Sequence, residues 1–530
     1  MRQHVEVRRG EYHDSVTLLA VSRTVAAVDG VAAAQVAMAT PLNVDVLQQM
    51  GFELPSCAPE DLVVAIRVAE DADEQATLDA ALAALTEALS PKQSGPAGSA
   101  GEPARTSGLA LRRAPAPLVL VSVPGEHAAT EAWDALTAGA SVMLFSDNVS
   151  VADEVALKTE AARRGLLVMG PDCGTAVVGG VGLGFANVVR PGPVSLVAAS
   201  GTGAQHLMAL LDAAGVGVRH CLGLGGRDLG SDVGGLGAAQ ALRVLAADEG
   251  TELVVVVSKP ADDAVVQRLR ELAADLGVQV EWATLGPDEP DLTAAAERVC
   301  ARLDVAVPAW PSWQPDGATP TPAAVDPTSG GFGGSQPAGR PPKPSRDRGL
   351  LRGLFAGGTL CDEAMAVAGR RLGPVASNIP LAGWPALTVD GPSALGDALA
   401  AAGHAMVDLG DDALTLGRAH PMIDPSLRLE AVRAAADDDR VRVVLLDVVL
   451  GHGAHADPAS EHAPVVRDAL AAGRAAGRDL DVVVSLTGTV ADPQGRDAQA
   501  RALAAAGAHV LLSNAAATQL AVDLATGARA

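Results

Sequence analysis

The stretch VSLVAASGTGAQHLMALLDAAG, residues 194–215, indicates the fold of this chain. Its first residues are apolar or small, as in a buried strand, and the run from Ala204 to Ala214 has the composition of a helix. A glycine-containing turn, Ser200–Gly203, joins the two. A strand that leads directly into a helix is the unit from which parallel sheets with right-handed crossovers are built. The stretch therefore predicts an α/β layer structure.

Strands and helices alternate in the same way on both sides of this stretch. Residues 117–125 and 141–147 are predicted strands with a helix between them. Residues 349–369 again combine a strand, a Gly-Gly turn and a helix, and residues 441–455 and 479–489 contain further apolar strands. We therefore predict a flavodoxin-like α/β protein, in which ligands bind beyond the carboxyl ends of the strands.

Two segments rich in Pro, Gly and Ser divide the chain and are predicted linkers. The segment before the first linker alternates strand and helix and predicts a small α+β module. The predicted order is an N-terminal α+β module at 1–89, a linker at 90–114, a half-size α/β domain at 115–190, an α/β domain at 191–304, a linker at 305–348 and a last α/β domain at 349–530.

The composition argues against several classes of protein. The formal net charge of −24 argues against binding nucleic acid or an anionic membrane surface through a basic field. The five cysteines are scattered without a CxxC pair, which argues against a disulfide framework and a structural zinc site. The first ten residues are too polar for a secretory signal, and the apolar runs are far short of the roughly 20 residues that span a bilayer. We expect a cytoplasmic protein without a bound metal.

Two glycine-containing turns are candidate anion sites, because each lies between a predicted strand and a predicted helix. The first N–H groups of a helix lack intrahelical partners and lie at the positive end of the helix dipole. The residues are Ser200, Gly201, Thr202 and Gly203 in one turn, and Gly357, Gly358 and Thr359 in the other. We expect both turns to bind one phosphate-sized anion between their domains. The alternative is that these small residues only allow tight packing.

Histidines and cysteines near predicted loops are further candidates. His420 follows the acidic run 408–412, and His452 and His455 follow an apolar strand. The His-x-x-His spacing suits metal binding or proton transfer, and ordinary loop hydrogen bonds are the alternative. Cys361 lies in the first turn of a predicted helix, where a thiolate is favoured, but we prefer its interpretation as a small buried residue.

Several segments resemble succinyl-CoA synthetase. Residues 195–226 (SLVAASGTGAQHLMALLDAAGVGVRHCLGLGG) resemble the ligase domain of its alpha subunit. Residues 168–180 (VMGPDCGTAVVGG) resemble the end of the CoA-binding domain, with Asp172 where the synthetase has Asn. Residues 354–365 (LFAGGTLCDEAM) resemble the carboxy-terminal ligase domain of the beta subunit, as do VVVSLTGT and AAAGAHVLLSNAA further along.

The order of these segments, together with LGDDALTLGRAHPMID and LGHGAHADPA, is similar to that of the FdrA family of acyl-CoA synthetase-like proteins. The resemblance implies that 115–190 is part of a CoA-binding domain, 191–304 an alpha-type ligase domain and 349–530 a beta-type ligase domain. In the synthetases each glycine turn begins a so-called power helix that holds the phosphate of a phosphohistidine. This likeness implies a phosphate role for the two turns. The likeness of residues 168–180 to the end of the CoA-binding domain implies a substrate-binding role for Asp172, Cys173 and Gly174.

The sequence also departs from the synthetase pattern. The half-size domain lacks a Gly-rich opening turn, so we expect weak or absent CoA binding. Residues 258–305 contain no histidine, and no segment remains for an ATP-grasp domain. Lys259 stands in the loop that is acidic in the synthetase, where its charge could neutralise a phosphate.

FdrA-family proteins resemble components of a purine-catabolic carbamoyltransferase system that handles oxamate. The resemblance therefore implies a carbamoyl- or acyl-phosphate transferase that works in an oligomer with operon-encoded partner subunits. Inorganic phosphate or carbamoyl phosphate is the expected ligand, and no cofactor is assigned with certainty. The candidate catalytic residues are Lys259, His420, His452 and His455. The alternatives are a nucleotide-dependent acyl-CoA synthetase and a non-catalytic scaffold.

Overall fold

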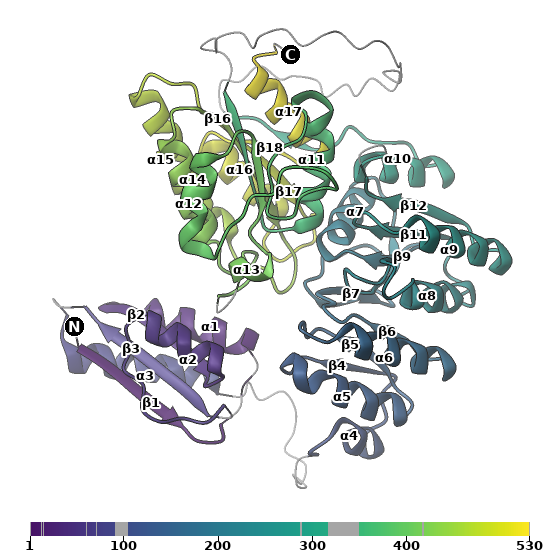
Figure 1. Ribbon diagram of the computed structural model, residues 1–530, viewed down its shortest axis with the longest axis horizontal. Helices are drawn as coiled ribbons and strands as arrows, with labels where there is room; N and C mark the ends of the chain where they lie inside the picture. Colours follow the sequence, from purple (N-terminus) through teal and green to yellow (C-terminus); the bar gives the residue numbers. More distant parts are fainter. Residues whose placement is uncertain are drawn as a thin grey trace. The chain divides into compact units, whose positions relative to one another are not determined.

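The computed structural model describes residues 2–11, 13, 15–59, 61–69, 72–90, 104–286, 289–315, 349–415 and 418–528 (Figure 1). The chain forms two compact units, one of residues 1–105 with 416–419 and the other of residues 106–415 with 420–530. Most of the two predicted linkers lies outside the described residues. In the described part of the chain, no helix combines the length and the apolar character needed to cross a bilayer.

The first unit is a three-stranded antiparallel sheet with helices. Its strand order is β1-β3-β2, and its core is built from aliphatic side chains such as Val25, Leu62 and Leu85. The elements are β1 (Arg2–Arg8), α1 (Ser15–Ala26), β2 (Val31–Met38), α2 (Pro41–Gln49), β3 (Leu62–Val68) and α3 (Glu74–Leu89). This is the α+β module that the sequence predicts.

The second unit begins with a small parallel sheet of order β4-β5-β6. Its elements are α4 (Ser107–Arg113), β4 (Leu118–Val121), α5 (Gly125–Thr137), β5 (Ser141–Leu144), α6 (Val151–Arg163) and β6 (Val168–Met169). Helix α4 lies inside the predicted linker 90–114, so the linker prediction is wrong there. The start of α4 is held by α5, because the N–H of Gly108 donates to the Asp134 carboxylate at 2.6 Å. Leu111 of α4 is buried.

A six-stranded sheet of order β12-β11-β9-β10-β7-β8 follows. Its elements are β7 (Thr175–Val178), β8 (Val181–Gly184), β9 (Val194–Ala199), α7 (Gly201–Ala213), β10 (Val218–Gly223), α8 (Leu236–Ala246), β11 (Leu253–Ser258), α9 (Asp263–Leu276), β12 (Val280–Thr284) and α10 (Leu292–Arg302). Strands β7 and β8 form a hairpin whose residues fall within the predicted domain 115–190. This hairpin instead pairs with β10, where Cys221 lies opposite Val177, and so completes the larger sheet.

The last sheet has the order β13-β18-β17-β16-β14-β15. Its elements are β13 (Ser312–Trp313), β14 (Leu350–Phe355), α11 (Gly358–Leu372), η1 (Pro392–Ala394), α12 (Leu395–Ala401), β15 (Ala405–Asp408), α13 (Asp412–Thr415), α14 (Ser426–Asp437), β16 (Val441–Val449), α15 (Pro458–Ala475), β17 (Asp481–Thr487), α16 (Arg496–Ala505), β18 (His509–Leu511) and α17 (Asn514–Thr526). Strand β13 lies in the predicted linker 305–348 and pairs antiparallel with β18, which corrects the start of that linker.

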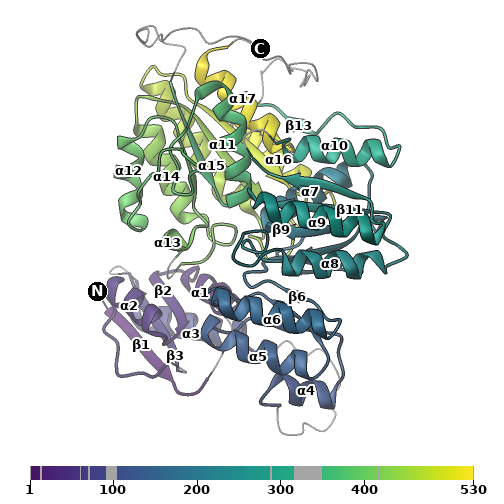
Figure 2. The same ribbon diagram turned by 45° about the vertical axis from the view of Figure 1, so that its right-hand side comes forward.

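Helices α7, α11 and α17 join the two six-stranded sheets through one apolar core (Figure 2). Leu207 of α7, Met365 of α11 and Val522 of α17 are fully buried members of this core. Because residues of both sheets belong to the same core, the strand ends before α7 and α11 are held in fixed positions. The predicted α/β fold with parallel sheets is therefore confirmed.

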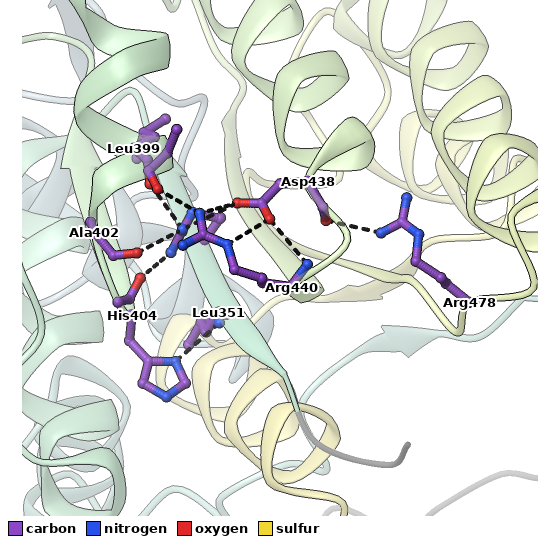
Figure 3. A network of polar contacts seen from close by, with 10 residues as sticks. Leu351, Leu399, Ala402, His404, Asp438, Arg440 and Arg478 are labelled. Atoms are coloured by element: carbon purple, nitrogen blue, oxygen red, sulfur yellow. Dashed lines mark hydrogen bonds and ion pairs between the residues drawn. The ribbon is translucent and has the colours of Figure 1, made fainter. Parts of the chain in front are cut away.

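A polar network around the buried Arg352 side chain fixes the start of β14 (Figure 3). The Arg352 guanidinium of β14 donates to the carbonyls of Leu399 and Ala402 at 2.9 and 3.1 Å, at the carboxyl end of α12. Asp438 lies 3.7 Å from Arg352 and also pairs with Arg440. Burial lowers the pKa of Arg352 to about 10, and the negative charge of Asp438 opposes this shift. These bonds anchor the strand that leads into the second glycine turn.

Candidate functional site

The two glycine turns lie in direct contact. The Ser200 and Thr359 hydroxyl oxygens are 2.6 Å apart, and both residues are buried. Ser200 is the N-cap of α7 and accepts the N–H of Gly203 at 3.0 Å, and Gly357 is the N-cap of α11. The starts of both helices therefore face the same region of the second unit.

The contact is reciprocal. Thr359, the second residue of α11, contacts the N-cap of α7, and Thr202, the second residue of α7, contacts the N-cap of α11. A Cβ on Gly357 would lie 2.7 Å from Thr202 Oγ1, and a Cβ on Gly203 would lie 2.8 Å from Thr359 Cγ2. Glycine is therefore needed at these positions because the opposite helix approaches so closely.

A buried carboxylate organises the turn before α11. Asp447 of β16 accepts the N–H groups of Ala356 and Gly357 at 2.7 and 2.9 Å, and Arg428 donates to it at 2.9 Å. Burial raises the pKa of Asp447, and the Arg428 charge and these N–H groups lower it in part. Among the described residues, the N–H groups of Gly201 and Thr202 in α7 have no hydrogen-bond acceptor, and neither do those of Gly358, Thr359 and Leu360 in α11, where Gly357 offers no side-chain cap.

Lys259 and two carboxyls border the start of α11. Lys259 directly follows β11, and its Nζ lies 2.9 Å from the position of a Cβ on Gly358. Asp408 Oδ2, at the end of β15, lies 2.5 Å from the same position. Burial raises the pKa of Asp408 to about 7 and that of Asp362 to about 6, and in both cases the Lys259 charge opposes the shift. The site therefore holds one cation and two carboxyls that take up protons near neutral pH.

Asp172 lies in the electrostatic neighbourhood of Lys259. Burial raises its pKa to about 6, nearby Asp147 and Asp412 add to the shift, and the Lys259 charge opposes it. Its φ of 56° places it in the left-handed region, in a turn after β6. The Asp172 carboxyl is therefore held close enough to the site to respond to its charges.

The two residues that follow Asp172 contribute differently. The Cys173 thiol is buried, and it donates to the Thr175 carbonyl at 3.5 Å. Burial raises its pKa to about 12, so it is not a thiolate at neutral pH. The carbonyl of Gly174 accepts the N–H of Phe185 at 2.8 Å. Cys361 of α11 is also fully buried, and burial raises its pKa well above the usual range.

The three candidate histidines lie in different surroundings. His420 Nε2 lies 2.7 Å from the position of a Cβ on Gly410, whose N–H donates to Asp408. Burial lowers the pKa of His420 to about 4, so it is neutral at pH 7. His452 is exposed, and its backbone pairs with Ala186. His455 lines a small cavity that also contacts Arg428, with room for about one water molecule. His420 and Asp408 therefore both lie close to Gly410, whereas His455 and Arg428 line the same small cavity.

Comparisons with known proteins place the chain in a family. Residues 1–105 match the family model described as AllF, heavy metal-associated domain, and residues 354–524 match the one described as CoA-ligase. The chain is 35% identical over 519 residues to the uncharacterized protein YahF of Escherichia coli (strain K12), which covers 96% of this chain and 95% of YahF.

Two further similarities cover a smaller share of the chain or have a lower sequence identity. The chain is 29% identical over 148 residues to the alpha subunit of succinate–CoA ligase [ADP-forming] of Methanothermobacter thermautotrophicus, which covers 27% of this chain and 49% of that subunit. A solved structure of the dinucleotide forming acetyl-coenzyme A synthetase 1 of Ca. Korarchaeum cryptofilum, in complex with phosphate and ADP, covers 79% of this chain and 84% of that one. Its identity is 11% and its TM-score 0.29, too low to assign any residue.

The description of the first family model raises the question of a metal in unit 1. Among the described residues, no group of three or more His, Cys, Asp or Glu side chains is arranged to hold a metal ion. Cys57 is a partly buried free thiol, and the His13 imidazole lies 3.1 Å from a Glu11 carboxylate oxygen. The described donors therefore do not fit a metal centre in this unit.

The alignment with YahF spans nearly the whole of both chains, and the CoA-ligase match contains the second glycine turn, α11 and Asp408. The alpha-subunit likeness adds the relationship to succinate–CoA ligase. This chain belongs to the FdrA-like family of acyl-CoA synthetase-like proteins, which is related to the alpha subunit of succinate–CoA ligase.

Proposed function

We propose that this CoA-ligase-like protein binds an acyl phosphate with its phosphate at the paired starts of α7 and α11, and transfers the acyl group to a thiol such as that of CoA. The observation that carries the proposal is the reciprocal contact of the two turns, with Thr359 against Ser200 and Thr202 against Gly357. One exposed helix end stabilises an anion by only about 0.3–1 kcal/mol, so two ends and a lysine give a more useful site.

The CoA-ligase match favours a CoA thiol as the acceptor, because the relatives with a named activity are CoA ligases. One feature speaks against a CoA acceptor. The domain of the half-size parallel sheet β4-β5-β6 lacks the Gly-rich opening turn that binds CoA in the synthetase pattern. A second candidate is therefore a carbamoyltransferase that takes carbamoyl phosphate and acts with operon-encoded partners. The absence of histidine from residues 258–305 favours it, because no phosphohistidine relay is available in that stretch.

The test compares binding and turnover in two glycine variants. Gly201→Val places methyl groups beside the free N–H groups of α7, where a Cβ alone would reach Thr175 Oγ1 at 3.4 Å. Gly226→Val is the matched control, since a Cβ there meets nothing within 4 Å. We expect the wild type and the control to bind inorganic phosphate in calorimetric titrations, and Gly201→Val to lose most of this affinity while circular dichroism shows an intact fold.

Turnover then separates the two candidate functions. Acetyl phosphate with CoA tests thioester formation, and carbamoyl phosphate with oxamate, alone and with the products of neighbouring genes, tests carbamoyl transfer. Equal phosphate binding by Gly201→Val and the wild type would contradict the proposed place of the phosphate.

A further inference from the structure

We propose that Asp408 is the acid–base residue of this site and protonates the oxygen that leaves with the phosphate of an acyl phosphate. The inference rests on the proposed function and adds a catalytic residue to it. Its basis is the position of the carboxyl, which is fixed close to Gly358, the first residue of α11, as is the Lys259 ammonium group.

Several hydrogen bonds fix Asp408. Its N–H donates to the Asn378 side-chain oxygen, and its carbonyl accepts from the Asn378 amide, both at 2.9 Å. Oδ1 accepts the N–H of Gly410 at 2.9 Å. The residue is 6% exposed, and in the part of the chain that the structure describes Oδ2 has no hydrogen-bond or ion-pair partner. This oxygen lies toward Gly358 at the start of α11, and it is the Asp408 atom that remains to meet a ligand there.

Lys259 lies close to the same glycine. Its Nζ and Asp408 Oδ2 are 2.9 and 2.5 Å from the position of a Cβ on Gly358, yet the two described side chains form no ion pair with each other. A ligand oxygen near Gly358 therefore has both an ammonium group and a carboxyl group close to it. The ammonium group offsets the phosphate charge, and the carboxyl group supplies a proton.

The surroundings of Asp408 bring the pKa of its carboxyl close to neutral pH. Burial raises its pKa to about 7, and the charges of Asp447 on β16 and Asp362 on α11 add to the shift. Lys259 and the Gly410 N–H oppose it. His420, beyond Gly410, is neutral because burial lowers its pKa to about 4. A catalytic acid works best when its pKa is near the working pH, and Asp408 meets this condition.

The step balances without a further reactant. The thiol sulfur forms a bond to the acyl carbon, and the bond from that carbon to the bridging oxygen breaks. The electron pair stays on the oxygen, which takes the proton of the Asp408 carboxyl and leaves as hydrogen phosphate. The Asp408 carboxylate then accepts the thiol proton, so that the carboxyl group is restored and the products are a thioester and phosphate.

The test uses Asp408→Asn in the full chain, with Asp411→Asn as the matched control. Asn keeps an oxygen for the Gly410 N–H, and in the control it keeps an oxygen for the Ala413 N–H, which Asp411 accepts at 3.0 Å. The first probe is sulfate, a tetrahedral dianion whose charge is constant from about pH 6 to about pH 8.5. We expect the sulfate affinity of the wild type and the control to fall about tenfold per pH unit above about pH 7, because Asp408 ionises there. The sulfate affinity of Asp408→Asn should show no such fall near pH 7.

The second measurement is turnover of acetyl phosphate with CoA. We expect Asp408→Asn to lower kcat by about 10²–10⁴-fold with little change in KM for acetyl phosphate, the usual contribution of an acid–base group. If no anion binds to the wild type at any pH, both the proposed function and this inference are wrong. If sulfate binds but the wild type shows no step near pH 7, or Asp408→Asn keeps that step, only the inference is overturned. The wild-type profile decides this even if Asp408→Asn does not fold.

Discussion

Gly357→Ala tests the contact between the two turns. The backbone at Gly357 is extended, with φ −116° and ψ 112°, so alanine causes no backbone strain. Its Cβ would lie 2.7 Å from Thr202 Oγ1 and 2.8 Å from Thr202 Cβ and Cγ2, closer than such contacts allow. Overpacking of this kind costs about 1–3 kcal/mol, and the lower entropy of the unfolded alanine chain offsets about 0.4–1 kcal/mol. We expect a net loss of up to about 2.6 kcal/mol in the free energy of unfolding, and about 1.3 kcal/mol at the middle of these two ranges.

The assay is a double-mutant cycle followed by urea and thermal unfolding. Thr202→Gly removes the three atoms that the new methyl group would meet. In that background Gly357→Ala should cost little, which gives a coupling of about 1–2 kcal/mol between the two positions. Gly396→Ala in α12 is the control, because a Cβ there meets nothing within 4 Å and alanine favours the helix. An equal cost of Gly357→Ala in both backgrounds would show that the two turns do not touch, and would refute the paired site.

Three further predictions concern ligands and charge. Because the half-size domain lacks a Gly-rich opening turn, calorimetry should show weak or absent CoA binding, and low-micromolar affinity would instead support a complete CoA site. Incubation with ATP, or with succinyl-CoA and phosphate, should leave no acid-labile phosphate on residues 258–305 by mass spectrometry, whereas phosphohistidine at His420, His452 or His455 would show that a relay has moved there. Burial raises the pKa of Asp362 to about 6, so the folded state loses stability relative to the unfolded state as pH rises from about 4 to about 6. Asp362→Asn should therefore stabilise the protein at pH 8 but not at pH 4, and a gain of equal size at both pH values would contradict this assignment.

Local patterns explain which parts of the site were predictable. The starts of α7 and α11 follow from a strand, a glycine turn and a helix in immediate succession, so the sequence alone predicts them. Asp408 is not among the candidate residues predicted from the sequence, because β15 has only four residues and the carboxyl belongs to the acidic run 408–412. A signal was present, since Asp408 ends an apolar segment where parallel strands place ligand-binding groups.

Partners that are distant in the sequence could not be predicted in the same way. Asp447 is a single acidic residue within the apolar run of β16, which marks it as unusual, but its bonds to the second turn depend on how β14 and β16 pair. Composition predicts the wrong domain boundaries at α4 and β13. The buried Leu111 helps to hold α4 in place, and strand β13 is held by its pairing with β18.

Asp447 also bears on the speed of ligand capture. Its carboxylate accepts the N–H groups of Ala356 and Gly357 in the protein itself, and Arg428 keeps it in place. The turn before α11 is thus already formed when a ligand arrives, and no binding free energy is used to order it. Association should accordingly be limited by diffusion and orientation of the anion rather than by a slow rearrangement of the loop. Rapid-mixing experiments would then show one concentration-dependent phase, without a plateau in the observed rate.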